Sequence, residues 1–115
     1  RIMLSIKSIL SGYIKLSTII FDEIDTGISG SVSSKVADLM CQMSKNMQVI
    51  VITHTPQVAS KGDFHFKVFK REVENKIITD IKLLKDKERV KEIAEMLSGD
   101  KSNKSANELA NELLN

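Results

Sequence analysis

Two short apolar runs, each followed by polar residues, constrain the fold of this chain more than any other feature of its sequence. Residues 17–22 read Ser-Thr-Ile-Ile-Phe-Asp, and residues 48–53 read Gln-Val-Ile-Val-Ile-Thr. Runs of this length that are rich in β-branched and aromatic residues are typical of buried strands in parallel sheets. Five apolar residues between the two runs recur at helical spacing: Val32, Val36, Leu39, Met40 and Met43. A strand, a helix and a second strand predict a βαβ unit with a right-handed crossover.

Helix signals also lie ahead of this unit and at the start of its middle helix. Residues 1–13 carry apolar side chains at three- and four-residue spacing, which predicts an amphipathic helix. Ser29 or Ser31 is the expected N-cap of the middle helix, because a serine oxygen accepts a hydrogen bond from an N–H group of the first helical turn.

A different pattern follows Pro56. Residues 64–84 alternate between apolar and polar side chains, with Glu74 and Asn75 as a two-residue turn between the two halves. Strict alternation on both sides of such a turn predicts an antiparallel hairpin.

Two helices are predicted over residues 86–115. The first stops at Gly99, since glycine readily adopts the backbone conformation that ends a helix. Ser105 and Glu108 have the spacing of a capping box and predict the start of the second. The pattern as a whole indicates an α/β chain.

Length and composition exclude several classes of protein. A chain of 115 residues has room for one domain with a modest core. Its net charge of +2 is too small to indicate a nucleic-acid or membrane surface by itself. The single cysteine, Cys41, favours a reducing compartment over a disulfide framework. We find no apolar stretch near the roughly 20 residues that span a bilayer. The first residue is Arg1 rather than Met, so we expect the chain to be a piece of a longer protein.

Two carboxylates end the first predicted strand. Asp22 and Glu23 follow the apolar run directly, at the edge where open α/β sheets bind their ligands. One carboxylate could hold Mg²⁺ and the other could orient or deprotonate a water for attack on a γ-phosphate. Judged on these two residues alone, a strand that ends in two solvated acids is the more common case.

His54 occupies the matching position after the second strand. Its imidazole could bond a phosphate oxygen or the attacking water. A histidine that caps a strand end before Pro56 is the alternative, and taken alone it is the more frequent one. The two strand ends together are more specific than either one.

The two strands resemble known ATPase motifs. Residues 18–23 resemble a Walker B strand, and this resemblance makes Asp22 the metal-side carboxylate and Glu23 the catalytic carboxylate. Residues 48–54 resemble the switch-histidine strand of ABC ATPases, with His54 as the second catalytic residue. The implied fold is part of a P-loop ATPase head of the ABC/SMC type.

The residues around these motifs narrow the family. Phe-Asp-Glu-Ile-Asp-Thr-Gly-Ile-Ser-Gly at 21–30 and Val-Ile-Thr-His-Thr-Pro-Gln-Val-Ala at 51–59 resemble RecN, an SMC-like family of DNA repair proteins. Residues 24–30 stand at the place of the D-loop, where Ile24 and Ser29 depart from the transporter pattern. The resemblance implies a dimer interface formed by Asp25, Thr26, Gly27 and Ser29.

The resemblance also shows what the chain lacks. Residues 1–13 resemble the helix that follows the family's signature motif, and the sequence holds no Gly-x-x-x-x-Gly-Lys-Ser/Thr loop to cradle phosphates. We therefore expect the 115 residues alone to be inactive as an ATPase. Activity would require the N-terminal half of the head with its Walker A loop.

The family implies ATP and Mg²⁺ as cofactors, in a longer protein that acts in double-strand-break repair and recombination. Its expected partners are the N-terminal half of the head, a second RecN-like protomer and DNA, and no membrane. Its expected location is the bacterial cytoplasm, at the nucleoid. Two alternatives stay open at this point: the head of another SMC-like or ABC-type ATPase, and a non-catalytic interaction module.

Overall fold

A computed structural model describes residues 17–23, 27, 29–99, 101 and 103–115 of the chain. The helix expected over residues 1–13 lies outside these described residues. Contacts within the chain divide it into two compact units, Arg1–Lys61 (unit 1) and Gly62–Asn115 (unit 2).

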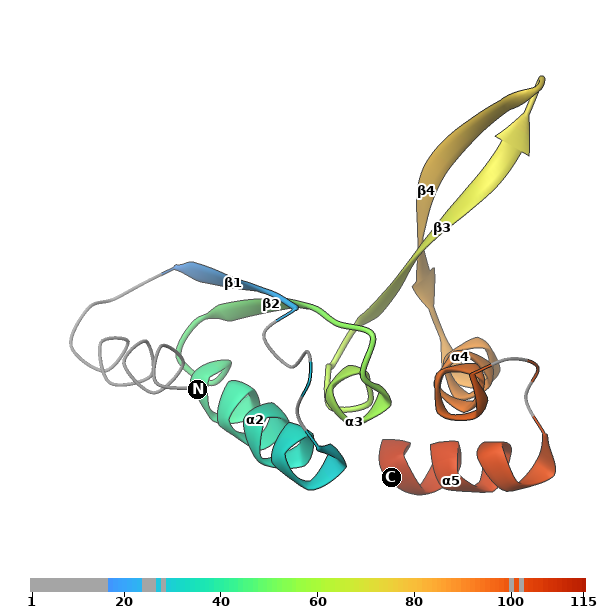
Figure 1. Ribbon diagram of the computed structural model, residues 1–115. Coiled ribbons are helices and arrows are strands. Elements are labelled where there is room, and N and C mark those ends of the chain that lie inside the picture. The colour runs from blue at the N-terminus through green and yellow to red at the C-terminus, as the bar shows by residue number, and fades with distance from the viewer. Residues whose placement is uncertain (1–16, 24–26, 28, 100, 102) are drawn as a thin grey trace. The chain divides into compact units, whose positions relative to one another are not determined.

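Unit 1 contains the βαβ arrangement that the sequence predicts. Strand β1 (Thr18–Asp22), helix α2 (Gly30–Met43) and strand β2 (Gln48–Ile52) follow one another, and a four-residue helix, α3 (Pro56–Ala59), comes after them. The two strands pair in parallel, with Thr18 opposite Gln48 and Asp22 opposite Ile52 (Figure 1). Because parallel neighbours share a direction, both strands end at the same edge of this sheet.

The core of unit 1 lies between one face of the sheet and the helices. Ile19 and Phe21 alternate with exposed residues along β1, and they join a buried cluster with residues of α2, α3 and the loop before β2. The cluster is completed by Ala37, Met40, Met43, Met47 and Val58. The three-residue steps from Ala37 to Met43 put these side chains on the helix face that meets the strand.

Within the part of the chain that the structure describes, the side chains on the opposite face of the sheet are exposed, so the strands are buried on one face. Ile20 is 59% exposed, Ile50 41% and Ile52 51%. Alternate side chains of a strand point to opposite faces, and no described helix of unit 1 covers this one. The apolar character of both faces was correctly read, but a strand can be apolar throughout without being covered on both sides.

Of the two serines predicted as possible N-caps of α2, Ser29 is the one that the structure shows. Its backbone is extended and its carbonyl oxygen accepts the N–H of Ser33 at 2.8 Å. The Ser29 hydroxyl makes no capping bond and lies 3.2 Å from the Ser31 hydroxyl instead. The position of the helix start was therefore predictable, although the capping bond was not.

Unit 2 consists of the predicted hairpin and two helices. Strand β3 (His65–Val73) pairs antiparallel with β4 (Lys76–Leu84), and helices α4 (Asp86–Ser98) and α5 (Lys104–Leu114) follow. Glu74 and Asn75 form the turn with φ of 50° and 62°. Two positive φ values in a two-residue loop match the twist of the strands, as in the common hairpin turns.

The helices of unit 2 form a small core with the end of the hairpin. Its buried apolar residues are Leu84, Ile93, Ala94, Ala106 and Ala110. Gly99 ends α4 with φ of 74°, as expected from its position.

The predicted capping box of α5 is wrong. The N-cap is Asn103, whose Oδ1 accepts the N–H of Ala106 at 2.8 Å. Asparagine is among the best N-cap residues, and it starts the helix early enough to place Ser105 inside the first turn.

Candidate functional site

The ends of β1 and β2 bring together the three residues singled out from the sequence. Asp22 is opposite Ile52 in the register, and the N–H of Glu23 donates to the Ile52 carbonyl at 2.9 Å. His54 follows Ile52 by two residues. We call Asp22, Glu23 and His54 the strand-end site. All three residues are exposed, so a ligand can reach them from solvent.

The backbone turns sharply at Glu23. Its φ is 51°, in the left-handed region that residues other than glycine seldom occupy. The bond to Ile52 extends the ladder by one step beyond β1, and the chain leaves the strand direction at this residue. Side chains no longer alternate strictly between the two faces of the sheet at this point. Two adjacent carboxylates can therefore contact the same ligand. Such strain is frequently found at functional sites.

The loop that carries His54 is fixed on both sides. The Thr53 hydroxyl oxygen accepts the N–H of Thr55 at 3.0 Å. Thr55 is the N-cap of α3, and its carbonyl oxygen accepts the N–H groups of Val58 at 3.2 Å and Ala59 at 3.0 Å. Helix α3 was not predicted, although Pro56 at its first position is a typical start signal for a helix.

The segment that resembles a D-loop is described only in part. Asp25 and Thr26 lie outside the described residues. Gly27 has φ of 77°, with open space around the position of a Cβ, so its conformation rather than crowding favours glycine there. Ser29 is exposed at the start of α2.

The strand-end carboxylates fit a magnesium ion in type. Mg²⁺ in proteins is commonly bound by one or two carboxylates with waters and substrate phosphates, rather than by a full cage of side chains. Asp22 and Glu23 are two such ligands, both accessible. Within the described ranges, no group of three or more His, Cys, Asp and Glu side chains could hold a metal ion. Two accessible carboxylates are the type of ligand that a magnesium ion shares with waters and phosphates.

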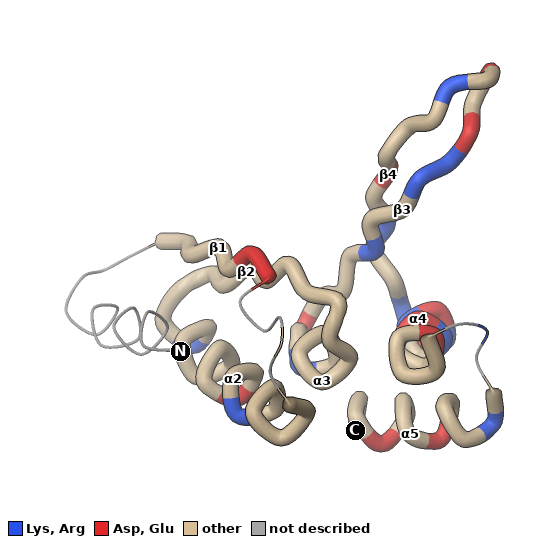
Figure 2. The backbone as a smooth tube through the Cα atoms, in the orientation of Figure 1, with Lys and Arg blue, Asp and Glu red and all other residues tan. Residues whose placement is uncertain are grey.

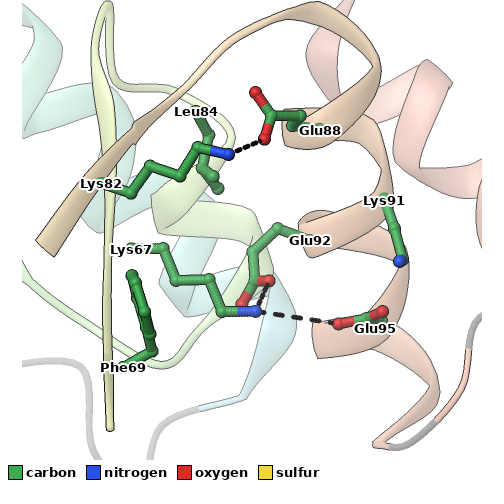
Figure 3. A pocket seen from close by; sticks show the side chains of 8 residues that line it. All are labelled: Lys67, Phe69, Lys82, Leu84, Glu88, Lys91, Glu92 and Glu95. Atoms are coloured by element: carbon green, nitrogen blue, oxygen red, sulfur yellow. Dashed lines mark hydrogen bonds and ion pairs between the residues drawn. The ribbon is translucent and has the colours of Figure 1, made fainter. Parts of the chain in front are cut away.

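A second charged cluster lies in unit 2, in a hollow between the hairpin and α4 (Figure 3). Lys67 and Lys82 are direct cross-strand neighbours on one face of the hairpin. Lys67 pairs with Glu92 and lies 3.9 Å from a Glu95 oxygen, and Lys82 pairs with Glu88. The hydrogen bond to Glu92 raises the pKa of Lys67. Lys67 and Lys82 are therefore each neutralised by a glutamate of α4.

Ion pairs connect the hairpin to α4 in this hollow. Farther along the hairpin, Arg71 Nε donates to Asp80 Oδ2 at 2.8 Å. The Ile81 N–H and Arg71 together hold the pKa of Asp80 below its usual value. Figure 2 shows basic and acidic residues mixed along the hairpin. Such a mixture is typical of a solvated face, since a DNA-binding groove gathers one sign of charge.

The chain is similar to curated proteins described as DNA repair protein RecN. It is 42% identical over 114 residues to the protein of Halalkalibacterium halodurans, which is 99% of this chain and 20% of that protein. It is 45% identical to the Rickettsia conorii protein over 99% of this chain, and 42% identical to the Bacillus subtilis protein over 86%. The chain spans about a fifth of the length of these relatives, at their C-terminal end. The resemblance to RecN is confirmed.

A solved structure supports the fold independently of the sequence. It comes from work on ATP-driven dimerization and DNA-stimulated activation of SMC ATPases, and it covers 76% of this chain and 52% of its own at a TM-score of 0.61. The identity is 22%, so this likeness concerns the fold. It confirms the expected α/β head architecture. No protein-family model matches the chain.

Among the helices that the structure describes, we find none with the length and apolar character needed to cross a bilayer.

Proposed function

Because the chain matches RecN proteins of DNA repair along nearly its full length, we propose that it is the C-terminal part of the ATP-hydrolysing head of a RecN-like protein. The observation that carries this proposal is the strand-end site: two carboxylates and a histidine at neighbouring ends of parallel strands. The proposed role of the whole protein is double-strand-break repair and recombination, at the nucleoid in the bacterial cytoplasm.

The three residues have separate tasks in this proposal. Asp22 binds the magnesium ion of Mg-ATP, directly or through water. Glu23 accepts a hydrogen bond from the attacking water and orients or deprotonates it. His54 donates a hydrogen bond to a γ-phosphate oxygen or holds the same water. Hydrolysis of the phosphoanhydride bond to the γ-phosphate depends mainly on such positioning and on neutralisation of charge.

The remaining parts of the reaction come from outside these 115 residues. No phosphate-binding loop occurs in the sequence, so the N-terminal half of the head supplies the contacts to the phosphates. A second RecN-like protomer approaches through Asp25, Thr26, Gly27 and Ser29. DNA is contacted by the longer protein. An interaction module without catalysis is the alternative function, and nucleotide turnover distinguishes the two.

A substitution of the catalytic carboxylate tests the proposal. We expect Glu23→Gln in the complete RecN-like protein to lower ATP turnover by about 10²-fold while ATP still binds, because the amide cannot act as a base. Glu74→Gln is a matched control, since Glu74 is also exposed and has φ of 50° against 51° for Glu23. Turnover within about twofold of the unmodified protein would remove Glu23 from the catalytic role.

A further inference from the structure

His54 belongs to a turn that a neighbouring side chain closes. The Thr53 hydroxyl oxygen accepts the N–H of Thr55 at 3.0 Å and so bridges the residue between them. A threonine oxygen bound to the N–H two residues later is a side-chain turn that competes with regular backbone hydrogen bonding. Thr53 is half-buried whereas His54 is exposed, so the hydroxyl lies at the base of the loop that presents the imidazole.

Both flanks of this turn are fixed to other elements. On the strand side, the Ile52 carbonyl accepts the N–H of Glu23 at 2.9 Å. On the helix side, the Thr55 carbonyl accepts the N–H of Ala59 at 3.0 Å in α3. Between these anchors, the peptide groups on either side of His54 are constrained by the Thr53 hydroxyl. The direction of the Cα–Cβ bond that carries the imidazole follows from the orientation of these peptides.

We propose that Thr53 is a positioning residue that sets the orientation of His54 for catalysis. This inference rests on the proposed function, because it assigns a task to Thr53 only if His54 contacts the phosphate or the water. Loss of the hydroxyl acceptor frees the N–H of Thr55 and allows the two peptides to rotate. A small displacement of a catalytic group lowers the rate much more than it lowers substrate binding.

Two substitutions at residue 53 separate the contribution of the hydroxyl group from that of the rest of the side chain. Thr53→Val keeps the branched shape without the acceptor, and Thr53→Ser keeps the acceptor without the methyl group. In the complete RecN-like protein, we expect Thr53→Val to lower kcat about tenfold with KM for ATP within about twofold. We expect Thr53→Ser to keep at least about half of the activity. Thr53→Ala is the second test of acceptor loss if the valine variant does not fold.

A double-substitution cycle with His54→Ala shows whether Thr53 acts through His54. If it does, the variant with both Thr53→Val and His54→Ala turns over ATP no more slowly than His54→Ala alone, because only the orientation of the imidazole has been lost. Independent, multiplying losses would overturn the positioning role, and so would full activity of Thr53→Val beside an impaired His54→Ala. Full activity of His54→Ala would instead contradict the proposed function itself.

Discussion

Both compact units carry a cluster of charged side chains, and the two clusters differ in the ion pairs that their side chains make. Among the described residues, no ion pair includes Asp22, Glu23 or His54 in unit 1. In unit 2, Lys67 and Lys82 each pair with a glutamate of α4. An exposed side chain that makes no ion pair can bind a ligand directly. A side chain in an ion pair must first lose its contact with the partner. The comparison supports the proposal that a ligand binds at the strand-end site, whereas Lys67 and Lys82 contact glutamates of their own unit.

The largest expected effect concerns the core of unit 2. Ile93 is 0% exposed, so Ile93→Ala leaves a cavity and lowers the free energy of unfolding by about 2–5 kcal/mol. Leu109→Ala is the matched control, because Leu109 is 49% exposed and its truncation costs about 0.5 kcal/mol. Urea unfolding of the chain measures both values. Equal losses for the two variants would contradict the assignment of the core.

A smaller effect concerns the left-handed glutamates, one in each unit. Glu23→Gly and Glu74→Gly should each raise the free energy of unfolding by about 0.5–1 kcal/mol, because glycine adopts a positive φ without strain. Thermal unfolding measures the gain in stability.

The two glycine variants differ in activity, which sharpens the comparison between the units. In the complete protein, Glu23→Gly should lose ATP turnover, while Glu74→Gly should retain it. If both variants kept full turnover, the Glu23 carboxylate would have no role in catalysis.

The smallest expected effect is a pH dependence that originates in unit 2. His65 is half-buried, and its Nδ1 has no hydrogen-bond partner among the residues that the structure describes. Burial lowers the pKa of His65, Arg89 and Lys67 lower it further, and Glu92 opposes them. A lowered folded-state pKa means that the neutral form is favoured by folding. Stability is then fully present above the unfolded value near 6.5 and declines as pH falls through the folded value.

Replacement of the histidine tests this pH dependence. His65→Gln should flatten the decline in unfolding free energy below pH 6.5. His54→Gln, at an exposed histidine of unit 1, is the control and should leave the decline in place. Unfolding curves of both variants between pH 7 and pH 5 provide the measurement. If the decline in unfolding free energy persisted in His65→Gln, titration of other groups would be its cause.

Periodicity was sufficient to predict most of the fold. Apolar runs, helical spacing and a turn at Glu74 and Asn75 correctly predicted the βαβ unit, the hairpin and the helices that follow it. The strand-end residues could be located as well, because parallel strands end at one edge and the polar residues follow each run directly. The roles of Asp22, Glu23 and His54 remain predictions.

What the sequence could not predict depends on contacts between distant residues. The pairing of Lys67 with Glu92 requires both the hairpin register and the placement of α4. The competition between Asn103 and Ser105 for the cap of α5 is decided by small energy differences between two good candidates. The exposure of Ile20 depends on which elements cover the sheet, and an apolar pattern contains no such information.

The registers of the two sheets also have a consequence for the order in which the chain folds. In the hairpin, Val73 faces Lys76 and Arg71 reaches Asp80 only nine positions away. In the parallel pair, Thr18 meets Gln48 thirty positions away. Hairpins form in about 1–10 μs, whereas non-local pairing must first close a long loop. The hairpin is therefore expected to form first, and the strand-end site, which exists only once β1 has met β2, to form late.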